Sequence, residues 1–303
     1  MLRYISLSIF TFLFSASLTA QTNGILPFTG IKYFRGGIWG KAIEVKLNGD
    51  TWMSNRLPLN YDFEIRLVEP RGLKQVGGKY FPGIKVLMLD AKKDTIAFAA
   101  NLFEENKGIG LDEAYLKSLK VSLGFTENDK VKPGDTCYQY ITFFDTKGNN
   151  DLRLEFPVII AKTTDSLQTT VTTYTSSSTT GYNAMAGGGI ELKKIETYID
   201  STYYPKSLYH NLRSAEMLGI TIEEVNNGKF QTWVYDEKMN ELPFIKPSKQ
   251  FVAKTFTDKE QINILAQVPL NPDDKKNRQY TVRYRWESVD GKKVLDIINN
   301  FMY

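Results

Sequence analysis

The feature that most constrains the fold is a run of alternating apolar and polar residues that occurs twice. Residues 279–287 read QYTVRYRWE, and residues 137–144 read CYQYITFF with the same alternation in a weaker form. A period of two residues puts successive side chains on opposite faces of a strand. One row should therefore face a core, and the other should face water or a partner. In the second run these rows are Tyr280, Val282, Tyr284 and Trp286 toward the core, and Thr281, Arg283, Arg285 and Glu287 away from it.

The two halves of the chain also match upstream of these runs. Each half carries strand-like segments in the same order, including an aspartate-led turn after a strand. The matched pairs are 63–69 with 218–224, 83–96 with 228–242, and 119–125 with 262–268. The spacing between matched positions varies by only a few residues, as loop insertions would produce. We therefore predict that one β unit has been duplicated.

Short strands separated by turn signals, in units of this size, are typical of antiparallel sandwiches. The sequence predicts an all-β protein with two tandem immunoglobulin-like β-sandwich domains, at residues 21–161 and 190–303. Helix is expected only as short turns, at 111–120 and at 207–218, because neither stretch offers three turns of 3.6-residue periodicity.

Residues 162–189 separate the predicted domains and are rich in threonine, serine and glycine. Such a segment has little apolar surface to bury, which favours a flexible linker. Its β-branched stretch TTVTTYT, at 169–175, also fits an edge strand of either domain. A ribbon that forms only on contact with a partner is a third interpretation.

Residues 1–20 have the outline of a secretory signal peptide. Arg3 precedes an apolar run that is followed by small residues, which places cleavage between Ala20 and Gln21. An uncleaved membrane anchor is the alternative, but the run is shorter than the ~20 apolar residues that span a bilayer. We expect export to the periplasm or cell surface of a Gram-negative bacterium, with no transmembrane segment after cleavage.

The charge balance and the cysteine count agree with that setting. The chain has 38 basic and 34 acidic residues, too even a balance to predict a nucleic-acid partner. Its single cysteine, Cys137, cannot form an intramolecular disulfide, which suits a bacterial envelope better than an animal extracellular fluid. We expect Cys137 to be a buried free thiol.

The residues that usually carry catalysis are scarce. There is one histidine, His210, which we expect in a loop, and no nucleophile motif surrounds it. One cysteine and one histidine do not supply an ordinary zinc site. Asp145, Asn149 and Asp151 surround a glycine as in a calcium loop, but hairpin turns select the same residues. We predict no enzyme activity, no catalytic residue, no metal and no cofactor.

The remaining candidates are surface residues. Trp39 and Trp52 are flanked by glycines or polar residues, which favours exposure, and exposed tryptophan can stack on a sugar or anchor a protein interface. Arg283 and Arg285 lie two residues apart on one strand face, where they could contact an acidic partner or be solvated. These four residues form the predicted interface or glycan site.

The LTAQ signal region and the tandem β layout resemble exported proteins of Bacteroidota. The layout is similar in style to periplasmic parts of the gliding and type IX secretion machinery. That resemblance implies envelope assembly or secretion as the setting, and it assigns no residue. Cargo of that system often ends in a sorting domain, whereas KKVLDIINNFMY, at 292–303, fits the last strand of the second unit.

Three hypotheses follow for function. The first is a non-catalytic, exported protein-binding scaffold with an envelope protein as its partner. The second is a carbohydrate-binding module, suggested by the tyrosine and tryptophan content. The third is a hydrolase that uses paired carboxylates, for which adjacent acids such as Glu104 and Glu105 are the weak sequence signal.

Overall fold

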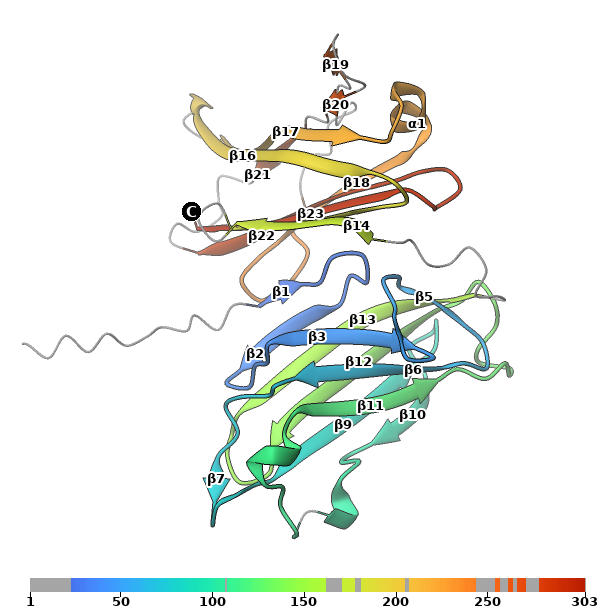
Figure 1. Ribbon diagram of the computed structural model, residues 1–303, viewed down its shortest axis with the longest axis vertical. Coiled ribbons are helices and arrows are strands. Elements are labelled where there is room, and N and C mark those ends of the chain that lie inside the picture. Colours follow the sequence, from blue (N-terminus) through green and yellow to red (C-terminus); the bar gives the residue numbers. More distant parts are fainter. Residues whose placement is uncertain are drawn as a thin grey trace, which may run out of the picture.

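The computed structural model describes residues 23–106, 108–161, 171–177, 181–204, 207–243, 254–256, 261–263, 266–270 and 278–302. The chain forms two β lobes stacked one above the other (Figure 1). The all-β class with antiparallel sandwiches is confirmed. Within the described ranges, no helix has both the length and the apolar character needed to cross a bilayer. The predicted signal peptide lies outside the described residues.

The first lobe is a sandwich of two sheets. One sheet contains, in spatial order, β1 (Gly24–Ile25), β2 (Lys32–Gly36), β13 (Asp151–Ala161), β12 (Thr136–Asp145), β9 (Pro82–Leu89) and β10 (Thr95–Ala99), with β5 (Arg56–Pro58) beside β13. The facing sheet contains β11 (Ser118–Gly124), β6 (Asp62–Val68), β3 (Ala42–Leu47) and β4 (Asp50–Thr51). A small hairpin, β7 (Gln75–Val76) with β8 (Lys79–Tyr80), and the 3-10 turns η1 (Glu104–Asn106) and η2 (Glu113–Tyr115) lie in the connections.

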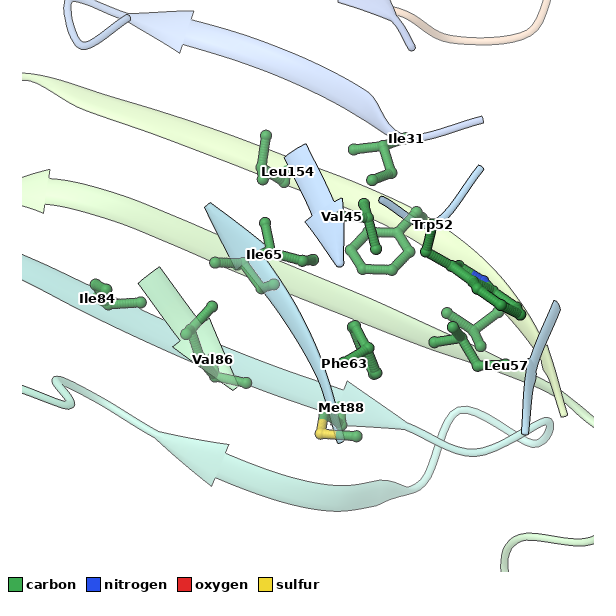
Figure 2. Close-up of a cluster of buried hydrophobic side chains, with 14 of the residues drawn as sticks. Ile31, Val45, Trp52, Leu57, Phe63, Ile65, Ile84, Val86, Met88 and Leu154 are labelled. Carbon is green, nitrogen blue, oxygen red and sulfur yellow. The ribbon is translucent and has the colours of Figure 1, made fainter. Parts of the chain in front are cut away.

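The core of this lobe forms where alternate residues of the two sheets meet. On β6, Phe63 and Ile65 are buried, and on β9 the residues Ile84, Val86 and Met88 are buried. Figure 2 shows these side chains pointing toward one another from opposite sheets. The period-two pattern of each strand therefore specifies one face of the core.

The second lobe repeats this plan. One sheet contains β14 (Val171–Ser177), β15 (Tyr182–Gly187), β23 (Val294–Met302), β22 (Gln279–Glu287) and β18 (Lys229–Tyr235). The other contains β16 (Glu191–Tyr204), β17 (Ser207–Leu218), β20 (Gln261–Asn263) and β19 (Lys254–Phe256), with β21 (Ala266–Leu270) beside β17. The short helix α1 (Ile222–Asn227) follows β17 in the chain. The row predicted to face a core is buried, as expected: Tyr280, Val282, Tyr284 and Trp286.

The central strands have the same order in both lobes. The order β2-β13-β12-β9 in the first lobe corresponds to β15-β23-β22-β18 in the second, and β3-β6-β11 corresponds to β16-β17-β20. The two aspartate-led turns also share their geometry. Oδ1 of Asp90 accepts hydrogen bonds from the backbone N–H groups of Lys92 and Asp94, and Oδ1 of Asp236 accepts from Lys238 and Asn240, all at 2.8–2.9 Å.

This order differs from that of an immunoglobulin constant domain. There the first two strands share a sheet and pair with each other, whereas here β2, which follows the two-residue β1, pairs with the last strand of its lobe, β13, and not with β3. Strand β3 then belongs to the facing sheet. The connection between β2 and β3 therefore crosses from one sheet to the other at the side of the sandwich.

Part of the segment expected to be a linker is sheet. Residues 171–177 form β14, an edge strand paired with β15, and β15 pairs with β23 in the second lobe. The β-branched threonines therefore pair with β15, a strand of the same segment, and β15 is held in the sheet by β23 from the end of the chain. The second lobe begins before residue 190, and residues 162–170 and 178–180 lie outside the described ranges.

Two further expectations were wrong. Residues 207–218 form β17 rather than a short helix. Residues 218–224, which we matched with β6, contain a turn and the start of α1, where Thr221 and Glu224 form a capping box. The counterpart of β6 is β17, because both occupy the middle of the smaller sheet.

One buried polar side chain generates a stability prediction. Gln139 on β12 is fully buried between Met88 and Phe156 of the neighbouring strands, and neither side-chain polar atom has a hydrogen-bond partner among the described residues. We expect Gln139→Met to raise the free energy of unfolding by about 1–3 kcal/mol, because it removes an unpaired amide at similar volume. Urea denaturation measures this change.

Gln139→Glu is the matched control, because it keeps the shape and buries a carboxylate, and we expect it to lower stability. A methionine variant less stable than the parent protein would contradict the prediction.

Candidate binding groove between the lobes

The predicted outward row of β22 faces the first lobe. Residues 23–31 of the first lobe, which include β1, lie across this sheet (Figure 1). Arg283 is buried there, and Arg285 is half-buried. The alternation did not identify what covers Arg283 and Arg285, and the structure shows that it is the first lobe of the same chain.

A buried ion cluster holds this contact. The Asp296 carboxylate on β23 is fully buried and accepts from Arg283 Nε at 3.0 Å, Arg283 Nη2 at 2.5 Å and Arg285 Nη1 at 3.1 Å. It also accepts from the backbone N–H of Phe28 in the first lobe, at 3.0 Å. Gly30 has φ of +68°, and a Cβ there would lie 3.0 Å from Arg283 Nη1, so glycine suits both the turn and the space.

The electrostatics keep the cluster charged. Burial by itself raises the pKa of Asp296, but Arg283 and Arg285 beside the carboxylate hold that pKa below its ordinary value. Burial works against the charged form of Arg283, and Asp296 outweighs it and raises the pKa of Arg283. Because a buried charge without a partner is costly, each member of the cluster requires the others.

Apolar packing surrounds the ions. Ile25 of the first lobe packs with Tyr235, Met239 and Ile298 of the second lobe. The Lys32 ammonium donates to the carbonyl of Met239 at 2.9 Å. Burial lowers the pKa of Lys32 and raises that of Tyr235. The lobes are thus joined by a mixed interface of apolar and ionic contacts.

Beside this contact lies a groove of about 490 Å³. The first lobe contributes β2, β3 and the connection between them, and the second lobe contributes β14 and β15. The groove opens at the side of the sandwich where that connection crosses between the sheets. Aromatic and polar side chains from both lobes therefore line one space.

Trp39 and Trp52 both line this groove, but in different ways. Trp39 is 45% exposed, and its backbone exchanges hydrogen bonds with Arg71, at 3.2 and 2.8 Å. Trp52 is only 4% exposed and packs in the core near Val45 and Leu57 (Figure 2). Its indole N–H donates to the carbonyl of Arg56 at 3.0 Å. Exposure was thus predicted correctly for Trp39 and wrongly for Trp52, because the polar residues that flank Trp52 do not reveal that its ring packs into the core.

The second lobe contributes an exposed aromatic ring that the sequence reading missed. Tyr174 on β14 is 57% exposed, and its hydroxyl lies 3.3 Å from Oδ1 of Asn183 on β15. Across the groove, the Arg35 guanidinium lies 5.3 Å from the ring centre of Tyr33. Burial raises the pKa of Tyr33, so that hydroxyl stays neutral. The available signal for Tyr174 was the strand-like stretch TTVTTYT.

The catalytic candidates lie in separate cores. Cys137 is buried in the core of the first lobe, where burial raises the pKa of its thiol to about 11. His210 is in β17 rather than in a loop, and it is fully buried. Its Nδ1 lies 2.7 Å from the Tyr284 hydroxyl and its Nε2 lies 2.5 Å from Asn299 Oδ1. Neutral histidine fits this setting by donating to the amide oxygen and accepting from the hydroxyl.

Asp145 of the candidate calcium loop accepts backbone hydrogen bonds from within the loop and from another segment. The buried Asp145 carboxylate accepts from the N–H groups of Lys74 and Lys147, at 2.7 and 2.9 Å. In the part of the chain that the structure describes, no three histidine, cysteine, aspartate or glutamate side chains gather as a metal site would require.

A second exposed surface lies at the far end of the first lobe. Phe98 on the edge strand β10, and Leu102, Ile109 and Tyr115 in the connection 100–117, are all exposed. The backbone N–H of Leu102 donates to Ile84, and Leu111 pairs with Tyr80, so this connection runs along the start of β9. We call these four residues the apolar end.

The ion cluster predicts a large effect from one substitution. We expect Asp296→Ala to lower the free energy of unfolding by about 3–5 kcal/mol, because the buried Arg283 loses its counter-ion and the half-buried Arg285 is left with the Glu287 carboxylate. Denaturant titration checks the size of the effect, and hydrogen exchange over residues 24–31 checks the loss of docking.

Lys41→Ala is the control, because its ion pair with Glu69 is exposed and should contribute less than about 1 kcal/mol. Equal effects of the two substitutions would contradict the role of the cluster.

His210 predicts a pH dependence of stability. Burial lowers its pKa to about 4 from an ordinary 6.5. As pH falls from 6.5 to 4, the unfolded chain takes up a proton and the folded chain does not, so about 3 kcal/mol of stability is lost. We expect the stability advantage over a His210→Gln variant to shrink by that amount across this range, measured by urea denaturation. An advantage that stays constant with pH would contradict the prediction.

Comparisons with known proteins give no family. No protein-family model matches the chain, and no curated protein matches it. One solved structure, named pT26-6p, aligns over 92% of this chain and 64% of its own, with 8% sequence identity and a TM-score of 0.23. The chain thus spans less than two thirds of that structure, and a similarity at this level carries no argument about fold or function.

Proposed function

We propose that this protein is a non-catalytic, exported scaffold that binds an envelope protein in cell-envelope assembly or secretion. The observation that supports this function best is the apolar end. Four large apolar side chains are exposed in this region, one on an edge strand and three on the long connection that follows it. Large apolar residues exposed in one region of a surface are typical of protein contacts, and long loops often carry function.

The two-lobe architecture supports a scaffold. The ion cluster and the apolar packing around it join the lobes, and the apolar end lies at the opposite end of the first lobe from this junction (Figure 1). A partner at the apolar end would therefore be held at a defined distance from the second lobe. The signal-like residues 1–20 and the single cysteine support an exported setting.

The groove supports carbohydrate binding as a second candidate, because Trp39 and Tyr174 present exposed rings from its two walls. The hydrolase hypothesis has less support there. Among the described residues that line the groove, Glu44 is the one carboxylate, whereas glycosidases need a facing pair.

Site-specific crosslinking tests the protein-binding proposal. A photoreactive residue in place of Ile109 should crosslink to one discrete envelope protein in living cells. The same residue in place of Val289, which is 83% exposed in the second lobe, is the control and should give none. We expect Tyr115→Ser, which removes a ring that is 72% exposed, to weaken recovery of that partner about tenfold.

Two results would contradict the proposal. One is the absence of any crosslinked protein from position 109. The other is equal recovery of the same protein from positions 109 and 289, which would indicate contact without a specific surface.

A further inference from the structure

The groove between the lobes combines flat rings with polar groups on both sides. Trp39 comes from the first lobe and Tyr174 from the second, and each is about half exposed. Trp52 forms part of the floor from within the core. The volume of about 490 Å³ lies within the ~300–1,000 Å³ common for ligand sites.

The polar side chains that line the groove include both basic and acidic groups, so its net charge is small. Arg35, Asn183 and Glu44 line the groove and offer both hydrogen-bond donors and acceptors. Lys41 also lines it, but its ammonium pairs with Glu69 at 3.3 Å, and the Glu44 carboxylate lies 3.9 Å from the Lys46 ammonium. The groove therefore has no strong excess of one charge that would select an anionic or a cationic ligand.

These features fit the chemistry of a sugar chain. A pyranose ring has an apolar face of C–H groups, which stacks on an aromatic ring, and a rim of hydroxyls that donate and accept hydrogen bonds. Side chains such as Asn183 and Glu44 can pair with adjacent hydroxyls. Rings on opposite walls would contact different sugar units along one chain.

The walls of the groove are held in place before a ligand arrives. Trp39 is anchored through its backbone to Arg71, and Tyr174 through its hydroxyl to Asn183. The Asp296 cluster fixes the lobes that carry them. Such preorganisation matters for sugars, because each contact is weak and ordering the site would cost affinity.

We propose that this groove binds a neutral oligosaccharide, with Trp39 and Tyr174 as stacking platforms and Asn183, Glu44 and Arg35 as hydroxyl ligands. The site is separate from the apolar end, so a sugar chain and a protein partner can be bound together. The protein would then connect a polysaccharide to an envelope protein.

Calorimetry with defined hexasaccharides tests the inference. The probes are cellohexaose, xylohexaose, mannohexaose, maltohexaose and chitohexaose, with hexagalacturonate as the acidic comparison. We expect at least one neutral probe to bind with a Kd between about 10 μM and 1 mM. Trp39→Ala and Tyr174→Ala should each weaken that binding about tenfold.

Two controls separate stacking from loss of structure. Trp39→Phe keeps an aromatic ring and should retain most of the binding. Tyr115→Ser at the apolar end should bind the sugar as the parent protein does, although it should lose the protein partner. The two proposals therefore fail independently.

Three outcomes would overturn the sugar site. They are no binding by any neutral probe, binding of hexagalacturonate alone, and binding that survives both Trp39→Ala and Tyr174→Ala. Displacement of a bound neutral probe by an unrelated extended peptide would indicate a peptide groove instead, and would also overturn it.

Discussion

The arrangement of this protein depends on one buried carboxylate. Asp296 lies on the second lobe, and its ligands are two arginines of that lobe and the backbone N–H of Phe28 from the first. A buried charge is tolerated only with its partners in place. Undocking of the segment 23–31 would therefore expose the cluster to water or remove one of its hydrogen-bond donors. The contact is therefore specific as well as stabilising. This contact determines which face of the second lobe the first lobe covers. The groove forms beside it, because its walls come from both lobes.

The duplicated unit is used differently in the two lobes. In the first lobe the aspartate-led turn places Lys93, at φ of 73°, on the surface. In the second lobe the same turn places Met239, at φ of 62°, where it is buried against the first lobe. The same turn geometry is thus exposed to solvent in the first lobe and forms part of the interface in the second.

Both cores contain a polar residue, and their settings differ. His210 has a hydrogen-bond partner at each ring nitrogen, so its burial is compensated and it fixes the positions of Tyr284 and Asn299. The Gln139 amide has no such partner among the described residues. Buried polar groups need hydrogen-bond partners. By this rule His210 contributes to the structure, whereas Gln139 is a position where an apolar substitution should stabilise the protein.

The sequence by itself determined the strand class, the core-facing row from Tyr280 to Trp286 and the shared aspartate turns, because period-two alternation and turn chemistry are local properties. It also identified Trp39 as exposed. It could not decide the fate of Arg283 and Arg285, since alternation says which face a residue occupies and not what covers that face. Nor could it show that Trp52 is buried, that Tyr174 lies on a strand or that His210 is in a core, because alternation does not say how strands pair or how two sheets pack together. Only the tertiary structure brought the two lobes together, and the groove is lined by Trp39 and Trp52 of the first lobe and by Tyr174 of the second.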